Sequence, residues 1–323
     1  MRKTINQEKI SGRVYDHNLS LKTVQDSKSK NFGKPFIKGT LDVATTDNGL
    51  NVVTVEFAFP VMEYYNSGKV NSTFNVLKSI IENGKTIVDN GINEATKVKV
   101  DASLGVNDFY TNRDGDEVLV SVKRNEGSFV SIVTKLDAES DRNTFETDML
   151  INGTRLVEAD PEKGIDADYL VIKGVVFDFR GAIKPVEFVV KNTNGIQYFE
   201  SLDINKNNIV FTKVWGKIET QSVTTTKTQA SAFGEAKVTN YTNTKKEWIV
   251  IGAAEEPYPL DDDQNGITKE TITKAIADRE VYLADVKKKQ DEWKQQQAAN
   301  GNNTSTPASN STSVGAAEGG FNF

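Results

Sequence analysis

The sequence predicts a mainly β protein made of two similar five-stranded units, followed by a helix and a disordered tail. Three observations support this prediction. Short runs of Val, Ile, Thr and Phe with alternating polarity fill most of residues 1–254, an arrangement of strands around one helix occurs twice, and the composition changes after Pro257-Tyr-Pro. With 323 residues the chain is long enough for two domains. We expect domains at residues 1–138 and 139–257, a linker and amphipathic helix at 258–297, and a tail at 298–323.

The first unit contains five predicted strands, with a helix between the third and the fourth. Its strands alternate apolar and polar residues and are bounded by Gly, Asn and Asp, which is typical of strands with one buried face. The helix, Ser72–Asn83, begins with a capping-type Ser and places Phe74, Leu77 and Ile80 on one face. The strands are expected at residues 10–24, 36–45, 50–59, 96–104 and 117–133.

The second unit repeats this order, with a helix predicted at residues 194–202. Three short matches occur in the same order in both units, and their common order favours duplication over chance. They are Ile10-Ser-Gly with Ile151-Asn-Gly, Ile37-Lys-Gly with Ile172-Lys-Gly, and Val55-Glu-Phe with Val186-Glu-Phe. The strands are expected at residues 144–157, 169–179, 184–191, 209–220 and 235–253.

Three strands, a helix and two more strands is the order of an OB-fold, a small five-stranded Greek-key barrel. The long first strand of that fold bends at a glycine, and Gly12 and Gly153 stand where such a bend would fall. A β-sandwich is the alternative, because it also has short strands and turns. The helix at the same place in both units favours two OB-fold-like barrels.

The last part of the chain is helical and then of low complexity. Its helix spans about residues 268–297 and either docks on a barrel or mediates self-association. From Ala298 onward the chain consists largely of Asn, Ser, Thr, Gly and Ala, a composition that cannot bury enough apolar surface to order itself, and it ends in Phe321-Asn-Phe323. The apolar stripe of the helix consists of Ile272, Ile276, Leu283, Val286 and Trp293.

Several kinds of chemistry are excluded by composition. The chain has no Cys and one His, His17, which excludes a thiol nucleophile and a Cys/His zinc site. It has no phosphate-binding or dinucleotide-binding glycine motif. Residues 261–266 resemble the first half of an EF-hand loop, but the position of the essential Glu is taken by Ile272. We therefore expect a protein that is not an enzyme and that needs no metal or cofactor.

Charge and hydropathy indicate where the protein acts. The beginning of the sequence has no apolar signal segment, and no stretch is apolar enough to span a bilayer, so we expect a cytoplasmic protein without a membrane partner. The formal net charge is −6. A nucleic-acid-binding surface would therefore have to be a local basic patch.

Residues 22–38 form such a patch. They contain five lysines and a single acid, Asp26, with Phe32 and Phe36 interleaved. Within it, Lys28 to Lys34 falls in the loop between strands one and two, one of the two loops that bind oligonucleotides in OB-folds. Lysines hold the phosphate backbone and exposed rings stack on bases, while the alternative is an ordinary solvated loop. The candidate binding residues here are Lys22, Lys28, Lys30, Phe32 and Lys34.

Further candidates combine rings and cations elsewhere in the two units. Alternation places Phe211, Lys213, Trp215 and Lys217 on one strand face, which favours a solvated, usable face. Alternation also places Phe177 and Phe179 together, which is more typical of a core. The other candidates are Tyr64, Tyr65 and Lys69 before the first helix, and Phe109, Tyr110, Arg113, Lys123 and Arg124 around the hairpin of strands four and five.

The strand order, the lysine and aromatic loop near Phe32, and the polar tail with an aromatic tip together resemble phage-type single-stranded DNA-binding proteins with tandem OB-like folds. The resemblance implies that the barrel faces and loops hold single-stranded DNA. It also implies that a C-terminal tip, here Phe321 and Phe323, recruits replication or recombination proteins. This chain departs from that pattern because only Glu318 precedes the tip, where several acids are usual.

The sequence therefore predicts a protein that binds single-stranded DNA without sequence preference in phage replication or recombination, in the cytoplasm of the host. The alternative is a structural or assembly β-barrel protein of a virion, and a third hypothesis is a hydrolase that uses scattered carboxylates. The choice of DNA over RNA, the site size and the oligomeric state are left open.

Overall fold

The computed structural model describes residues 2–160, 165–229, 233 and 237–299. Its first barrel is closed by five strands. Strand β1 pairs with both β3 and β5, β3 pairs with β4, β4 pairs in parallel with β6, and β6 pairs with β5. The short strand β2 extends the edge of β3. The strands are β1 Asn6–His17, β2 Ser20–Thr23, β3 Pro35–Ala44, β4 Val52–Met62, β5 Lys97–Arg113 and β6 Asp116–Ile132.

The second barrel has the same topology. Strand β7 pairs with both β8 and β10, β8 pairs with β9, β9 pairs in parallel with β11, and β11 pairs with β10. The predicted pair of OB-fold-like barrels is therefore confirmed. A sandwich is excluded, because each set of five strands closes into a barrel. The strands are β7 Asn143–Val157, β8 Tyr169–Phe177, β9 Ile183–Val190, β10 Val210–Gln229 and β11 Lys237–Ala253.

Each barrel has its helix between the third and fourth barrel strands, as predicted. Helix α1, Ser72–Asn83, buries Phe74, Leu77 and Ile80 in the first barrel and is capped by the Asn71 side chain. Helix α3, Thr193–Ser201, buries Phe199 in the second barrel. A short helix, α2 (Ile87–Asn90), follows α1, and a 3₁₀ turn at Glu139–Asp141 lies between the barrels.

Glycine permits the close strand crossings that close the barrels. A side chain at Gly12 would place its Cβ 2.1 Å from the carbonyl oxygen of Ala44, at the point where β1 passes from β5 to β3. The predicted Gly153 lies at a register shift of β7, where this strand passes from β10 to β8, although the surroundings of Gly153 are open. A close approach in the second barrel occurs at Gly174 of β8, where an added Cβ would lie 2.1 Å from the oxygen of Leu150. Only a residue without Cβ fits at such contacts.

The two barrels share one sheet and one core. The first half of β1 pairs antiparallel with β7, so Asn6 lies opposite Thr147 and Ile10 opposite Asn143. The side chain of Asn6 donates to the carbonyl of Leu104 in the first barrel at 3.0 Å and to that of Phe177 in the second at 3.2 Å. Buried residues of both barrels form one contiguous hydrophobic cluster, which makes the body rigid across the junction.

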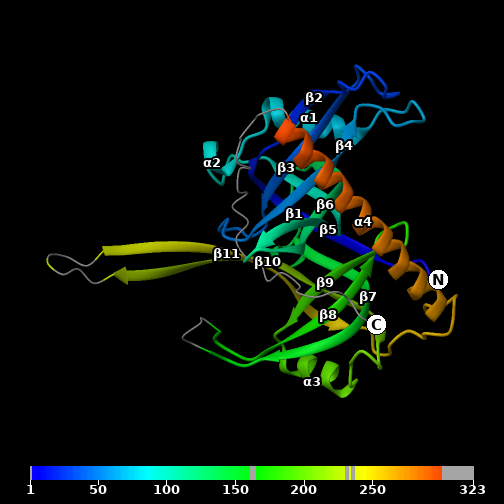
Figure 1. The fold of residues 1–323 in the computed structure, drawn as a ribbon. Coiled ribbons are helices and arrows are strands. Elements are labelled where there is room, and N and C mark those ends of the chain that lie inside the picture. Colours follow the sequence, from blue (N-terminus) through cyan, green and yellow to red (C-terminus); the bar gives the residue numbers. More distant parts are fainter. Residues whose placement is uncertain (1, 161–164, 230–232, 234–236, 300–323) are drawn as a thin grey trace.

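Helix α4, Lys269–Ala299, lies along the outside of both barrels (Figure 1). Its first turns bury Ile272 and Ala275 against the outer face of the second barrel, including Phe211 and Phe177. Further along, Arg279 forms an ion pair of 2.8 Å with Asp108 of β5. Of the two roles predicted for this helix, the structure shows docking on the barrels. Polar contacts dominate the second half of the helix.

Strands β10 and β11 continue beyond the second barrel as a two-stranded arm that projects from the body (Figure 1). The pairing runs from Thr220 with Lys246 out to Gln229 with Lys237. The sequence pattern predicted that β10 ends near residue 220. The Thr-rich polar sequence beyond that residue does not show the alternation that identified the other strands.

Candidate nucleic-acid interface

Two predicted loops leave the first barrel at the same edge. The lysine loop, residues 24–34, connects β2 to β3, and the tyrosine loop, residues 63–70, follows β4. At this edge Thr23 pairs with Pro35, Phe36 pairs with Met62, and the N–H of Glu63 donates to the carbonyl of Pro35 at 3.5 Å. The two loops therefore begin on neighbouring strands, and residues about 30 positions apart in sequence form one surface.

Backbone hydrogen bonds order the lysine loop. The N–H of Val24 donates to the carbonyl of Lys34, and the N–H of Gly33 donates to that of Val24, both at 3.0 Å. The carboxylate of Asp26, the one acid of the loop, accepts the N–H of Lys28 at 2.9 Å. Gly33 adopts a φ of 75°, which glycine tolerates best. Phe32, Lys28, Lys30 and Lys34 are exposed on this framework.

The tyrosine loop is a compact hairpin that ends in the cap of α1. Tyr64 pairs with Val70, and the N–H of Tyr65 donates to the carbonyl of Lys69 at 2.9 Å. About half of the surface of each tyrosine is exposed, as expected for rings that are not part of a core. The loop thus presents two rings and the exposed Lys69 beside the lysine loop.

The cations of this edge have no acidic partners. None of the six lysines forms an ion pair with a residue in the described part of the chain, and the ammonium of Lys34 donates a hydrogen bond to the Asn31 side chain at 3.1 Å. The carboxylates of Asp26 and Glu63 are the acids on the two loops, so the local charge is positive although the whole chain is negative. Lysines without partners remain available to phosphates and release counterions on binding. The six are Lys22, Lys28, Lys30, Lys34, Lys38 and Lys69.

A groove leads from the loops across the outer face of the barrel. It has a volume of about 340 Å³ and is lined by β2, β3 and β4. Lys22 and Lys38 stand on its walls, and Glu56, which is 3.4 Å from Arg124, lies along it. Phe59, on β4 next to the groove residue Ala58, is largely exposed. We call the lysine loop, the tyrosine loop and this groove the first-barrel surface.

The candidates on β5 and β6 are not part of this surface. Tyr110 is half-buried, because Gln290 of α4 pairs with its backbone N–H and C=O and Lys287 lies 5.5 Å from its ring. Phe109 beside it is also half-buried, and Arg113 is exposed at the tip of the hairpin. Arg124 is held by Glu126 at 2.8 Å as well as by Glu56.

Lys123 was predicted to contact nucleic acid, and this prediction is wrong. Its ammonium donates to the carbonyl of Glu187 at 2.6 Å and lies 4.6 Å from the ring centre of Trp248, so it joins the first barrel to the second. Burial lowers the pKa of Lys123 to about 8, against a smaller opposing effect of the carboxylates of Glu187 and Glu247. A lysine enclosed between two barrels cannot reach a phosphate.

On β10 the predicted common face exists but is largely covered. Phe211 is fully buried, which corrects its assignment as a stacking residue: the C-terminal segment packs Tyr258 and Ile272 over it. Lys213 is paired with Glu146 at 2.9 Å. Trp215 is partly exposed and packs against Gly252, where an added Cβ would be 2.5 Å from the indole.

Lys217 at the end of that face is also withdrawn from solvent. Its ammonium is buried without a hydrogen-bond partner among the described residues, and burial lowers its pKa despite nearby Asp141 and Glu219. The candidates of the second barrel therefore do not form one basic surface with those of the first.

Three features of the surface were missed from the sequence. Lys38 and Phe59 lie on predicted strands, where alternation and neighbouring apolar residues suggest that side chains pack in the core. The available signal for Phe59 was the following Pro60, which indicates that the strand leaves the core there. The arm, residues 220–246, carries four lysines and one acid, Glu235, and its low content of acids was the available signal. Its base contacts the first barrel, because Lys246 donates to Thr54 of β4 at 3.1 Å.

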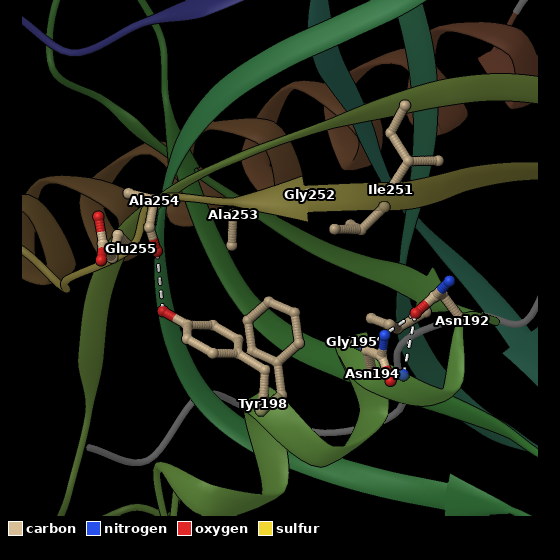
Figure 2. Close-up of a pocket in the computed structure, with 12 residues that line it drawn as sticks. Asn192, Asn194, Gly195, Tyr198, Ile251, Gly252, Ala253, Ala254 and Glu255 are labelled. Atoms are coloured by element: carbon tan, nitrogen blue, oxygen red, sulfur yellow. Dashed lines mark hydrogen bonds between the residues drawn. The ribbon is translucent and has the colours of Figure 1, made fainter.

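A more apolar hollow lies between α3 and the end of β11 (Figure 2). It has a volume of about 410 Å³. The hydroxyl of Tyr198 donates to the carbonyl of Ala254 at 2.9 Å across it, and Asn192 caps α3 at its other end. No Lys or Arg lines it, so it does not extend the basic surface.

Two structural features bear on other functions. Among the described residues, no three His, Cys, Asp or Glu side chains are grouped so that they could hold a metal ion. In the same part of the chain, no helix combines the length and the apolar character that crossing a membrane requires. The aromatic tip at Phe321 and Phe323 lies outside the described residues.

The fold was compared with solved structures. The wild-type single-stranded DNA-binding protein of Thermus aquaticus is similar at a TM-score of 0.46 and 10% identity, covering 82% of this chain and 98% of that one. A deletion mutant of that protein is similar at a TM-score of 0.44 and 9% identity, covering 81% and 100%. A replication protein A heterotrimer bound to single-stranded DNA reaches a TM-score of 0.17 at 10% identity, covering 79% and 66%.

Sequence comparison identifies the family. No curated protein matches the sequence. The family model YorF matches residues 5–289, which include both barrels and most of α4. Because this match covers most of the chain, the protein belongs to the YorF family.

Proposed function

We propose that this protein is a non-enzymatic, sequence-independent single-stranded DNA-binding protein, and that its first-barrel surface holds the strand. The observation that carries the proposal is the meeting of the lysine loop and the tyrosine loop at one barrel edge. Six lysines without ion-pair partners in the described chain stand there beside the exposed rings of Phe32, Tyr64 and Tyr65. Such a surface fits a flexible polyanion with exposed flat bases.

The chemistry of the surface explains why binding would not depend on sequence. An ammonium group contacts phosphates, which are the same at every nucleotide, and a ring stacks on any base. We infer that single strands bind far better than duplex, since the bases of a duplex are already stacked on each other and closed to the rings. The overall charge of −6 also disfavours coating duplex DNA by charge alone.

The course of the strand is proposed from the positions of the remaining free groups. It runs from the two loops through the groove past Lys22 and Lys38 toward the base of the arm. The surface there becomes less basic, because Lys246 faces the carboxyl group of Asp42. Two further lysines, Lys227 and Lys237, follow in the sequence of the arm.

We place this activity in phage replication or recombination in the host cytoplasm. The supporting feature is the segment Phe321-Asn-Phe323, because its two rings can fill a pocket on a partner protein. In this proposal the barrels hold DNA and the tip recruits replication or recombination proteins.

The decisive experiment compares strands of one sequence in two forms. Fluorescence anisotropy of a labelled oligo(dT) and of the matching duplex, each titrated at several salt concentrations, measures both affinities. We expect tight binding of the single strand, weaker binding of the duplex, and a log-log salt slope of about −0.7 for each phosphate contacted. Equal affinity for the two forms would contradict the proposal, and no binding to either would favour a structural protein.

A further inference from the structure

The turn between β8 and β9 displays an aromatic ring that the sequence pattern assigned to a core. Strand β8 ends at the buried Phe177, and Phe179, two residues later in the turn, is 90% exposed. The guanidinium carbon of Arg180 lies 4.9 Å from the ring centre of Phe179. Single exposed apolar residues are common on proteins, so the ring alone does not indicate a site.

Hydrogen bonds order the backbone of the turn that carries this ring. One carboxylate oxygen of Asp178 accepts the N–H groups of Arg180 and Ala182, both at 2.9 Å. The backbone of Asp178 also pairs with Ala182 and Gly181, and Gly181 adopts a φ of 82° that suits glycine. A backbone that is ordered before a ligand arrives loses little conformational entropy on binding.

The same turn forms one wall of a groove between the barrels. The groove has a volume of about 600 Å³ and is lined by residues 2–7, Ser103 and residues 177–181. Its lining is of mixed character and includes the polar side chains of Thr4, Asn6 and Gln7.

The free charges of the groove are positive. Arg2 is occupied, because its guanidinium stacks on Tyr258 at 3.9 Å and lies 3.6 Å from Asp148. Lys3 and Arg180 are exposed and form no ion pair with the described residues, while the carboxylate of Asp178 is held by its own turn and by Lys184 at 3.7 Å. The groove therefore combines two available cations with one ring.

We propose that this groove is a second contact site for the DNA strand, in which Phe179 stacks on a base and Lys3 and Arg180 bind the flanking phosphates. The inference rests on the proposed function. Strand β1 starts at this groove and ends next to the segment that leads to the lysine loop, so its twelve residues place the two sites up to about 40 Å apart. A strand of about four nucleotides is too short to reach both sites, whereas a long strand contacts both.

The test uses strand length to separate the sites. OB-folds hold about 4 to 16 nucleotides each, so oligo(dT) of about 4 and of about 30 nucleotides is titrated against the full-length protein. Phe179→Leu, which removes the flat ring but keeps an apolar side chain, should weaken binding of the long strand roughly 5- to 100-fold and leave the short strand unchanged. Phe179→Tyr should restore the affinity of the long strand.

Arg180→Gln tests the charge. It should lower the salt slope by about 0.7 for the long strand only. Lys206→Gln is the matched control, because Lys206 is an exposed lysine on another loop of the second barrel and its loss changes the net charge equally. Circular dichroism melting and sedimentation of every variant check that fold and oligomeric state are unchanged.

The outcomes are distinct. If the wild-type protein binds neither strand, the proposed function itself is wrong. If it binds both and Phe179→Leu has no effect on the long strand, the second site is wrong and the first-barrel surface remains. An equal loss for both lengths would place Phe179 at the first site and also overturn the inference. A changed sedimentation coefficient at unchanged affinity would show instead that the ring contacts protein.

Discussion

The indole N–H of Trp248 donates a 2.9 Å hydrogen bond to Oε1 of Glu8, and this contact joins the two barrels. Glu8 lies on β1 and Trp248 on β11, and both are buried. The other carboxyl oxygen of Glu8 is buried without a hydrogen-bond partner among the described residues. Burial raises the pKa of Glu8 from its usual 4.5 to about 8, although the Trp248 hydrogen bond opposes this and Glu126 adds to it.

The first prediction concerns the pH dependence of stability. The folded protein keeps the proton of Glu8 between pH 4.5 and about 8, whereas the unfolded chain releases it, so Glu8 makes the protein less stable as pH rises through this window. Glu8→Gln keeps the acceptor for Trp248 and cannot ionise. We expect the variant to gain stability over wild type with rising pH, by up to about 5 kcal/mol at pH 8, since each pKa unit corresponds to about 1.4 kcal/mol.

Urea unfolding of both proteins at pH 5, 6.5 and 8 measures this difference. Lys123 does not confound it, because its lowered pKa of about 8 affects stability only between pH 8 and 10.5, where it raises stability as pH rises. Parallel stability curves for the two proteins would show that Glu8 is ionised in the folded state.

The second prediction concerns the lysine loop. Lys28, Lys30 and Lys34 changed together to Ala should weaken binding of single-stranded DNA and reduce the salt slope by about 2, because each lost phosphate contact is worth about 0.7. The melting temperature should not change, since all three are exposed. Lys287→Ala, Lys288→Ala and Lys289→Ala on α4 together are the control for net charge. A triple loop variant with an unchanged slope would place the strand elsewhere.

The third prediction separates stacking from charge. Tyr64→Leu with Tyr65→Leu should reduce affinity by roughly 1 to 3 kcal/mol per stacked base and leave the salt slope unchanged, because no charge is removed. Tyr64→Phe with Tyr65→Phe retains both rings and should bind like wild type. Anisotropy titrations at two salt concentrations measure both quantities. Equal losses in the Leu and Phe pairs would mean that the hydroxyls, and not the rings, make the contacts.

The fourth prediction concerns the attachment of α4. The side chain of Arg279 is nearly buried and that of Asp108 is fully buried. Arg279→Met would leave the Asp108 carboxylate in the interior with Ser121 as its one polar side-chain partner among the described residues. Loss of one partner of a buried ion pair costs about 3 to 5 kcal/mol. Lys289→Ala, which removes an exposed ion pair with Asp285, should cost under about 1 kcal/mol. Urea unfolding compares the two, and similar costs would show that α4 is held by its apolar first turns.

The fifth prediction concerns the chain end. A protein that stops at Gly320 should bind single-stranded DNA as full-length protein does, since residues 298–323 contain no Lys or Arg. It should lose replication or recombination partners in a pull-down from infected-cell lysate, because Phe321 and Phe323 are removed. Identical sets of captured proteins would show that the tip is not a docking peptide.

Local patterns were enough to predict the barrels and the two loops of the first-barrel surface. Alternation of polarity and the position of each helix predicted the strand order of both units, because each strand buries one face and each helix one stripe whatever surrounds it. The lysine loop was also predictable, since exposed lysines around Phe32 have no buried neighbours to change their role.

Tertiary packing decided which of the other rings and cations stay accessible. Alternation correctly placed Phe211 on the outer face of its barrel, but the segment around Tyr258 and Ile272 covers that face from about 50 residues away in sequence. Lys123 is enclosed only because the barrels meet at Trp248, and Phe179 is exposed because β8 ends two residues before it. Residue type and spacing determine which face a side chain takes, whereas burial of that face depends on distant segments that a local pattern does not contain.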